Sequence, residues 1–158
     1  MDTQNYVDID ARETWFYQAI GASPAMFRRK EGSGFLYWLG LKDNKGKYVD
    51  GSKTYKLIIP TPLPAKRFWS ATVYDAKTRS QVATDQNKAA LRSMFELKDK
   101  IGSQSVDLYF GPKAPAGKEG QWIKSIPNKG WFVYICIYGP EKAAFDGSWK
   151  LGDFEEVK

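Results

Sequence analysis

Carboxylic acids are the side chains best suited to catalysis here, because the sequence of 158 residues contains no histidine. Without imidazole, a Ser-His-Asp triad, a Cys-His pair and the usual His-containing zinc sites are excluded. The remaining template is a pair of carboxyl groups, one kept protonated while the other stays charged, as in glycoside hydrolysis. The candidate catalytic acids are Asp75, Asp85 and Asp107. A hydrolase of glycosides or glycan amides is therefore one hypothesis.

Two basic residues lie where they could contact a ligand. Arg79 lies between Asp75 and Asp85 and could bind a carboxylate or a sugar, although an acid near an arginine is often a structural ion pair. Lys118 belongs to residues 113–120, which are rich in Pro, Gly and Lys. That composition is typical of a binding loop and equally of an ordinary hairpin connection.

Aromatic side chains indicate a different activity, the binding of a carbohydrate-like ligand. The chain has six Trp and nine Tyr, and rings with a polar edge suit the apolar C–H faces and hydroxyls of sugars. Tyr74, Asp107 and Tyr109 are expected to point outward if their strand neighbours point into the core. The predicted ligand-binding residues are Tyr74, Arg79, Tyr109, Lys118 and Trp122. The alternative is that most rings, including Trp38, Trp69, Trp122, Trp131 and Trp149, fill the core or an interface between subunits.

The residues predict neither a metal site nor a cofactor. A single cysteine, Cys136, cannot form an internal disulfide, and its apolar neighbours Ile135 and Ile137 predict a buried structural residue. The lack of histidine and of further cysteines leaves only oxygen-ligand cations such as calcium. Residues 43–46 (DNKG) lack the later ligands of a calcium-binding loop and predict a hairpin turn instead.

The charge distribution raises the possibility of nucleic-acid binding. The formal net charge is +6, and basic residues outnumber acidic ones in residues 42–67. Lys45 and Lys47 flank a predicted turn, and Lys53 and Lys56 lie on or beside a predicted strand. These positions favour solvated strand edges that deter pairing with another chain, so nucleic acid is an unlikely partner.

The elements that position these residues are mainly β-strands. Residues 106–110 (VDLYF) alternate between apolar and polar side chains, which predicts a strand with one buried face. Residues 131–138 (WFVYICIY) are apolar on both faces, which suits a central strand covered on both sides. Further strands are predicted at 35–41, 47–49, 54–59 and 67–75. Prolines 60, 62 and 64 predict a connection outside any strand ladder, residues 86–102 predict irregular structure, and the aromatic residues of 141–158 are expected to hold that tail against the sandwich.

The N-terminal residues have a helical pattern. Asp10 and Glu13 form a potential capping box, followed by apolar residues at helical spacing until Gly21. Ser23 and Pro24 predict the start of a second short helix reaching Arg29. We therefore expect a single domain, with residues 1–33 as a helical segment that packs on a β-sandwich of residues 34–158.

The first residues lack the basic start and the apolar stretch of a signal peptide, and no apolar run is long enough for a transmembrane helix. The sequence as given therefore predicts no membrane span and a cytoplasmic location. If it is a fragment of a longer secreted protein, the location would be outside the cell.

Several segments resemble the bacterial domain of unknown function 1214. They are residues 48–55 (YVDGSKTY), 68–75 (FWSATVYD), 78–81 (TRSQ), 106–112 (VDLYFGP), 130–132 (GWF) and 138–140 (YGP). The likeness extends from about Tyr6 to the C-terminal end. The resemblance implies a jelly-roll-like antiparallel β-sandwich, usually placed C-terminal to the domain of unknown function 1254. It implies no agreed activity and no catalytic residues.

The residues and the resemblance together favour an all-β module without catalytic activity. Its expected partners are a carbohydrate-like ligand, other subunits of the same protein, or a partner domain. The carboxylate-dependent hydrolase remains the alternative.

Overall fold

The structure is a computed structural model that describes residues 9–15 and 30–157. The chain divides into two units, residues 1–30 and 31–158. In the first unit, helix α1 spans Ile9–Trp15, and Asp10 lies in its first turn. The rest of the predicted first helix and all of the predicted second helix fall outside the described residues. The packing of residues 1–33 on the sandwich stays a prediction.

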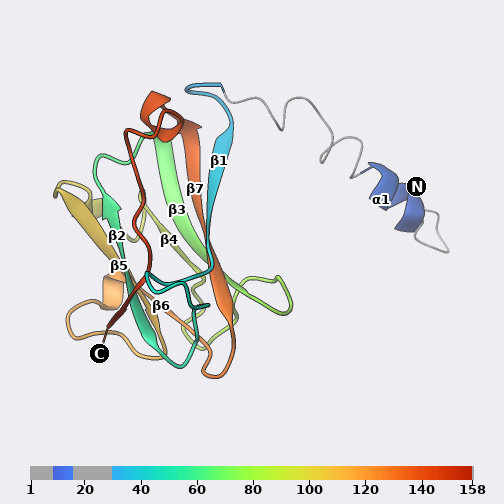
Figure 1. Cartoon of the computed structure of the whole chain (residues 1–158), viewed down its shortest axis with the longest axis vertical. Coiled ribbons are helices and arrows are strands. Elements are labelled where there is room, and N and C mark those ends of the chain that lie inside the picture. Colours follow the sequence, from blue (N-terminus) through green and yellow to red (C-terminus); the bar gives the residue numbers. More distant parts are fainter. Residues whose placement is uncertain (1–8, 16–29, 158) are drawn as a thin grey trace. The chain divides into compact units, whose positions relative to one another are not determined.

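The second unit is an all-β sandwich of two four-stranded sheets (Figure 1). The first sheet has the order β1 (Phe35–Gly40), β7 (Trp131–Pro140), β3 (Ala65–Asp75) and β4 (Ala90–Arg92), and every pair in it is antiparallel. The second sheet has the order β6 (Trp122–Lys124), β5 (Ser105–Gly111), β2 (Thr54–Pro60) and β8 (Glu155–Val157). In that sheet β5 and β6 run parallel, while the pairs β5–β2 and β2–β8 are antiparallel as the predicted antiparallel sandwich requires.

The core lies between the sheets and is made of side chains that alternate with outward-facing neighbours. In β5 the side chains of Val106, Leu108 and Phe110 are at most 1 % exposed, as the alternation predicts. In β7 the core residues are Trp131, Val133, Ile135 and Ile137, and they alternate with the outward residues Phe132, Tyr134, Cys136 and Tyr138. This strand lies between β1 and β3, which confirms the prediction of a central strand.

Two predictions about the connections are wrong in detail. Pro60 is the last residue of β2 and lies opposite Ser105 of β5, so the proline-rich connection starts one residue later than expected. Residues 86–102 contain β4 and the 3-10 turn Lys98–Lys100 rather than wholly irregular structure. Short 3-10 turns also form at Glu119–Gln121 and Lys142–Ala144.

The C-terminal residues close the sandwich as expected. Trp149 is 8 % and Phe154 2 % exposed, and both belong to the core cluster. The chain then ends in β8, which pairs with β2. Within the described residues, no helix has the length and apolar character needed to cross a membrane.

Candidate functional site

The outer face of the first sheet carries a layer of aromatic side chains, which we call the aromatic face. Because side chains alternate along a strand, the residues of β1, β7 and β3 that do not enter the core point outward. The face consists of Phe35, Tyr37, Phe68, Tyr74, Phe132, Tyr134 and Tyr138. Phe35 and Tyr37 are 48 % and 50 % exposed, and Leu39 beside them is 50 % exposed. Exposed large rings on adjacent strands are typical of a contact surface.

The rings of this face touch across all three strands. Tyr37 of β1 meets Tyr134 of β7 edge-on, with ring centroids 5.7 Å apart. Tyr134 in turn meets Tyr74 of β3 edge-on at 5.6 Å. Tyr74 is stacked on Phe132 with a centroid separation of 5.3 Å. These contacts restrict the rotation of each ring, so the surface is preorganised.

Cys136 lies under this layer. It is 6 % exposed, but it alternates with the core residues Ile135 and Ile137 and therefore lies on the aromatic face rather than between the sheets. Burial raises the pKa of its thiol. A neutral buried thiol is a poor nucleophile, which agrees with the structural role predicted for this residue.

A groove of about 620 Å³ is hollowed into one end of the aromatic face, and we call it the tyrosine groove. Its lining consists of Tyr37, Leu39, Leu41, Tyr74, Arg79, Phe132 and Tyr134. Within the described residues, the hydroxyls of its three tyrosines make no hydrogen bond to protein groups. Burial raises the pKa of Tyr37, so its phenol stays neutral and able to donate at ordinary pH. The groove therefore combines ring surfaces with free hydroxyl groups.

Arg79 enters the groove from the turn that follows β3. The Arg79 N–H donates to the carbonyl of Asp75 (3.0 Å), and the Asp75 N–H donates to the carbonyl of Ser80 (2.9 Å). Arg79 has a φ of 63°, which is uncommon outside glycine. Its guanidinium carbon lies 5.5 Å from the ring centroid of Phe132. Among the described residues no carboxylate lies within 4.0 Å of this guanidinium.

Asp75 holds this turn together. One oxygen of its carboxylate accepts the N–H groups of Lys77 (2.8 Å) and Thr78 (2.9 Å), and the other lies 3.8 Å from the ammonium of Lys129. The two backbone N–H groups, that of Thr78 most strongly, lower the pKa of Asp75. A general acid at neutral pH requires the opposite shift. The contacts of Asp75 are those of a residue that positions Arg79.

The other two candidate acids lie in separate local structures. Asp85 is bound to the ammonium of Lys124 at 2.6 Å, its side chain is 76 % exposed, and this hydrogen bond lowers its pKa. Asp107 accepts a long hydrogen bond of 3.4 Å from the hydroxyl of Tyr109. Within the described residues, no hydrogen bond or ion pair joins any two of the three predicted acids. A catalytic role for them stays a prediction.

The predicted ligand-binding residues fall into two groups on different sheets. Tyr74 and Arg79 both line the tyrosine groove, as described above. Tyr109, Lys118 and Trp122 lie around β5 and β6 of the second sheet.

Of the second group, Lys118 lines a shallow polar hollow of about 480 Å³ together with Asp107, whereas Tyr109 and Trp122 are not part of its lining. The ammonium of Lys118 lies 5.9 Å from the ring centroid of Tyr109, which is only 8 % exposed. The outward-facing ring expected at Tyr109 is thus largely covered. Trp122 donates its indole N–H to the carbonyl of Gly111 at 2.9 Å, which is a structural contact within the sheet.

Among the described side chains, four tryptophans belong to the core or pack against it. Trp69, Trp131 and Trp149 are buried in the core cluster, and Trp38 packs against it. The predicted aromatic contact surface is instead made of Tyr and Phe, and Phe35, Tyr37, Phe132 and Tyr134 were missed. In residues 35–39 and 132–138, aromatic side chains occupy every second position. This alternation, combined with the pairing of β1 and β7, could have identified them as one outward face.

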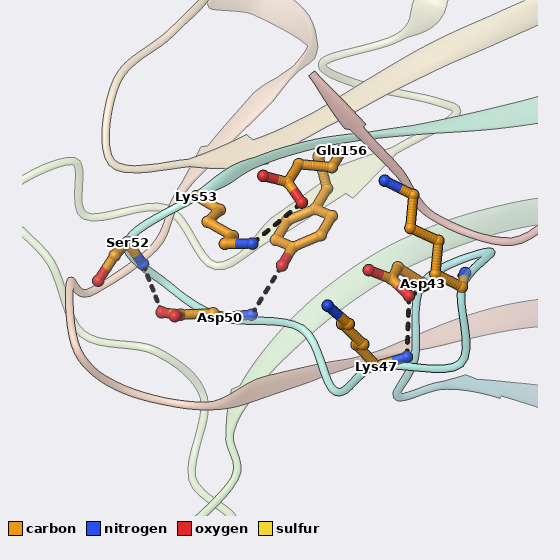
Figure 2. A network of polar contacts seen from close by, with 8 residues as sticks. Asp43, Lys47, Asp50, Ser52, Lys53 and Glu156 are labelled. Carbon is orange, nitrogen blue, oxygen red and sulfur yellow. Dashed lines mark hydrogen bonds and ion pairs between the residues drawn. The ribbon is translucent and has the colours of Figure 1, made fainter. Parts of the chain in front are cut away.

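Two lysines of the basic stretch of residues 42–67 are bound to acidic residues of the C-terminal tail. Figure 2 shows the ammonium of Lys53 reaching Glu156 at 3.0 Å, and Lys56 lies 3.3 Å from Glu155. In the same view Asp43 accepts the N–H of Lys47 at 2.9 Å. That carboxylate also accepts the N–H of Lys45, so residues 43–46 form the predicted turn. These contacts fix a strand edge and a turn.

Comparisons with known proteins give a family and a fold. The profile of the family described as "Protein of unknown function (DUF1214)" matches residues 34–142. No curated protein matches the chain. Among solved structures, the VPA0106 protein from Vibrio parahaemolyticus is similar, with a TM-score of 0.66 and 21% identity. The match covers 78% of this chain and 31% of that protein, so the chain spans about a third of its relative.

Proposed function

Since the chain belongs to the DUF1214 family, whose function is unknown, we propose that it is a binding module without catalytic activity. Its ligand is a carbohydrate-like molecule, bound in the tyrosine groove. The observation that carries this proposal is the groove itself, where three phenol hydroxyls and one guanidinium have no hydrogen-bond or ion-pair partner in the described chain.

The chemistry of the lining suits a sugar. Sugars present apolar C–H faces ringed by hydroxyl groups, so they need flat apolar surfaces and nearby donors and acceptors at once. Tyr37 offers a half-exposed ring, while Tyr74 and Tyr134 add partly exposed rings with hydroxyl groups. Because contacts with neighbouring rings already hold these side chains, little conformational entropy would be lost on binding.

Assembly with another protein is the second candidate. Among the described strands, β1 forms an edge of the first sheet and has β7 as its single neighbour. Phe35 and Leu39 on this edge are about half exposed and lack the charges that usually protect edge strands. Another subunit or a partner domain of a longer protein could cover them, and the resemblance described above implies such a domain on the N-terminal side.

Thermal unfolding against a panel of oligosaccharides tests the proposal. A ligand that binds only the folded chain raises its stability by about 2.7 kcal/mol at a hundred times the dissociation constant. We expect a saturable rise of the midpoint with one class of sugar. The variants Tyr37→Ala and Tyr134→Ala should abolish this rise.

Tyr48→Ala is the matched control, because Tyr48 is a 71 % exposed tyrosine that does not line the groove. If no sugar raises the midpoint, or if Tyr48→Ala has the same effect as the groove variants, the proposal is wrong. Sedimentation of wild type and of a Phe35→Ser, Leu39→Ser variant then tests assembly. A dimer that this variant dissociates would establish the second candidate.

A further inference from the structure

The turn after β3 presents a positive charge to the tyrosine groove and leaves it without a counter-charge. Arg79 is the charged residue of the groove lining, whose other members are apolar or phenolic. The nearest acid in sequence, Asp75, directs its carboxylate at the N–H groups of Lys77 and Thr78 and at Lys129. Lys77 on the same turn also has no acidic partner among the described residues. The groove is therefore electropositive at this end.

The backbone of Arg79 adds a second observation. A non-glycine residue at a φ of 63° adopts a conformation that costs free energy and persists only where the surrounding structure imposes it. Here the hydrogen bonds of Asp75 impose it, and the result is that the guanidinium lies over the ring of Phe132. A cation–π contact of this kind attracts the guanidinium to the ring and leaves its N–H groups available to a ligand.

We infer that the ligand of the tyrosine groove carries a carboxylate, so that the groove selects acidic sugars, such as uronic acids, over neutral ones. The inference rests on the proposed function and specifies its ligand. The planar guanidinium matches a carboxylate with two parallel hydrogen bonds, which gives both affinity and orientation. The phenols of Tyr37, Tyr74 and Tyr134 are left to bind the hydroxyl groups of the same sugar.

Calorimetric titration with two matched pairs of trisaccharides tests the inference. The first pair is α-1,4-linked trigalacturonate and galactotriose, and the second is β-1,4-linked triglucuronate and cellotriose. The members of each pair differ only in their carboxylates. We expect the acidic member of one pair to bind at least about tenfold more tightly, the ratio that one charge-assisted hydrogen bond supplies. Raising the salt concentration should reduce this ratio.

Arg79→Gln and Lys77→Gln form a matched pair of variants. Both remove one positive charge from the same turn, but only Arg79 lines the groove. We expect Arg79→Gln to bring the acidic-to-neutral ratio close to one while its unfolding midpoint stays near that of the wild type. Lys77→Gln should keep most of the preference.

The outcomes separate the inference from the proposed function. If a neutral trisaccharide binds as tightly as its acidic partner, the inference is wrong and the proposed function stands. The inference is also wrong if Arg79→Gln retains the preference for the acidic sugar, because a group other than Arg79 would then bind the carboxylate of the ligand. If none of the four trisaccharides binds while another sugar of the panel does, the inference is again wrong. If no sugar binds at all, both fail.

Discussion

The outer faces of the two sheets use their polar groups in opposite ways. On the second sheet and at its edges, the charges are joined to each other, as in the pairs Lys53–Glu156, Lys56–Glu155 and Lys124–Asp85. On the first sheet, Arg92 of β4 is bound to Glu96, but the phenols of the tyrosine groove and the guanidinium of Arg79 have no hydrogen-bond or ion-pair partner in the described chain. Several charges of the second sheet are thus neutralised within the protein, whereas the tyrosine groove of the first keeps donors free for another molecule. This contrast is the reason to place ligand binding on the first sheet.

Both faces depend on the same core, and breaking that core should have the largest effect. Leu108 of β5 is 0 % exposed, and Leu39 of β1 is 50 % exposed. Leu108→Ala should lower the free energy of unfolding by about 2–5 kcal/mol, because it removes buried methyl groups and leaves a cavity. Leu39→Ala should change it by no more than about 0.5 kcal/mol. Urea denaturation measures both, and a large loss for Leu39→Ala would mean that another part of the chain covers the aromatic face.

The change Asp75→Ala should lower the free energy of unfolding by less than Leu108→Ala does. This change removes the acceptor for the N–H groups of Lys77 and Thr78, so we expect a loss of about 1–2 kcal/mol in the free energy of unfolding. The released turn should also let Arg79 leave Phe132, so the variant should lose the preference for acidic sugars. Asp85→Ala is the control, since Asp85 is exposed and bound to Lys124 instead. Equal effects of the two changes on ligand preference would contradict the positioning role of Asp75.

The sequence predicted the strands better than the site. Alternation along residues 106–110 identified a strand with one buried face, and the long apolar run 131–138 identified a central strand. Both patterns are visible because burial of one face or of two faces determines which positions are apolar. The short strands β4, β6 and β8 carry too few residues for a period to be seen. The parallel pair β5 and β6 depends on the path of the intervening loop, which no local pattern encodes. The jelly-roll topology implied by the resemblance stays a prediction.

The site was predicted only in part because it is formed by neighbours across strands. Tyr74 and Arg79 were identified one by one, and the structure places both in the tyrosine groove. Tyr37 and Tyr134 become neighbours only through the register that sets Tyr37 opposite Cys136. Tryptophan was overvalued as a contact residue because its size makes it equally suited to the core, where Trp69 and Trp131 lie. Sequence spacing also could not reveal that the Asp75 carboxylate accepts the backbone N–H groups of its own turn, those of Lys77 and Thr78.

Acid pH should weaken the turn beside the groove. The folded-state pKa of Asp75 is lowered, so its charge contributes stability above its ordinary pKa of about 3.9 and loses it as the pH falls through the lower folded-state value. Asp75→Asn removes this titration but keeps an oxygen acceptor. Between about pH 5 and about pH 2, we expect the urea midpoint of the wild type to fall more than that of Asp75→Asn. Parallel curves would show that the charge of Asp75 does not stabilise the turn.

The smallest effect is expected on the second sheet, where the ion pairs are exposed. In the pair Lys53–Glu156 the side chains are 43% and 29% exposed, so solvent and salt screen most of their attraction. Glu156→Gln should therefore shift the unfolding midpoint less than Asp75→Ala does, and high salt should remove the difference from the wild type. The effect on β8 itself should be larger, because β8 has only three residues and, among the described strands, its one neighbour is β2. Amide hydrogen exchange in residues 155–157 should accelerate in this variant, while exchange in β7 stays unchanged. Faster exchange in β7 as well would mean that this ion pair stabilises the whole sandwich. It would then contradict the view that the charges of the second sheet act only locally while the first sheet keeps donors free.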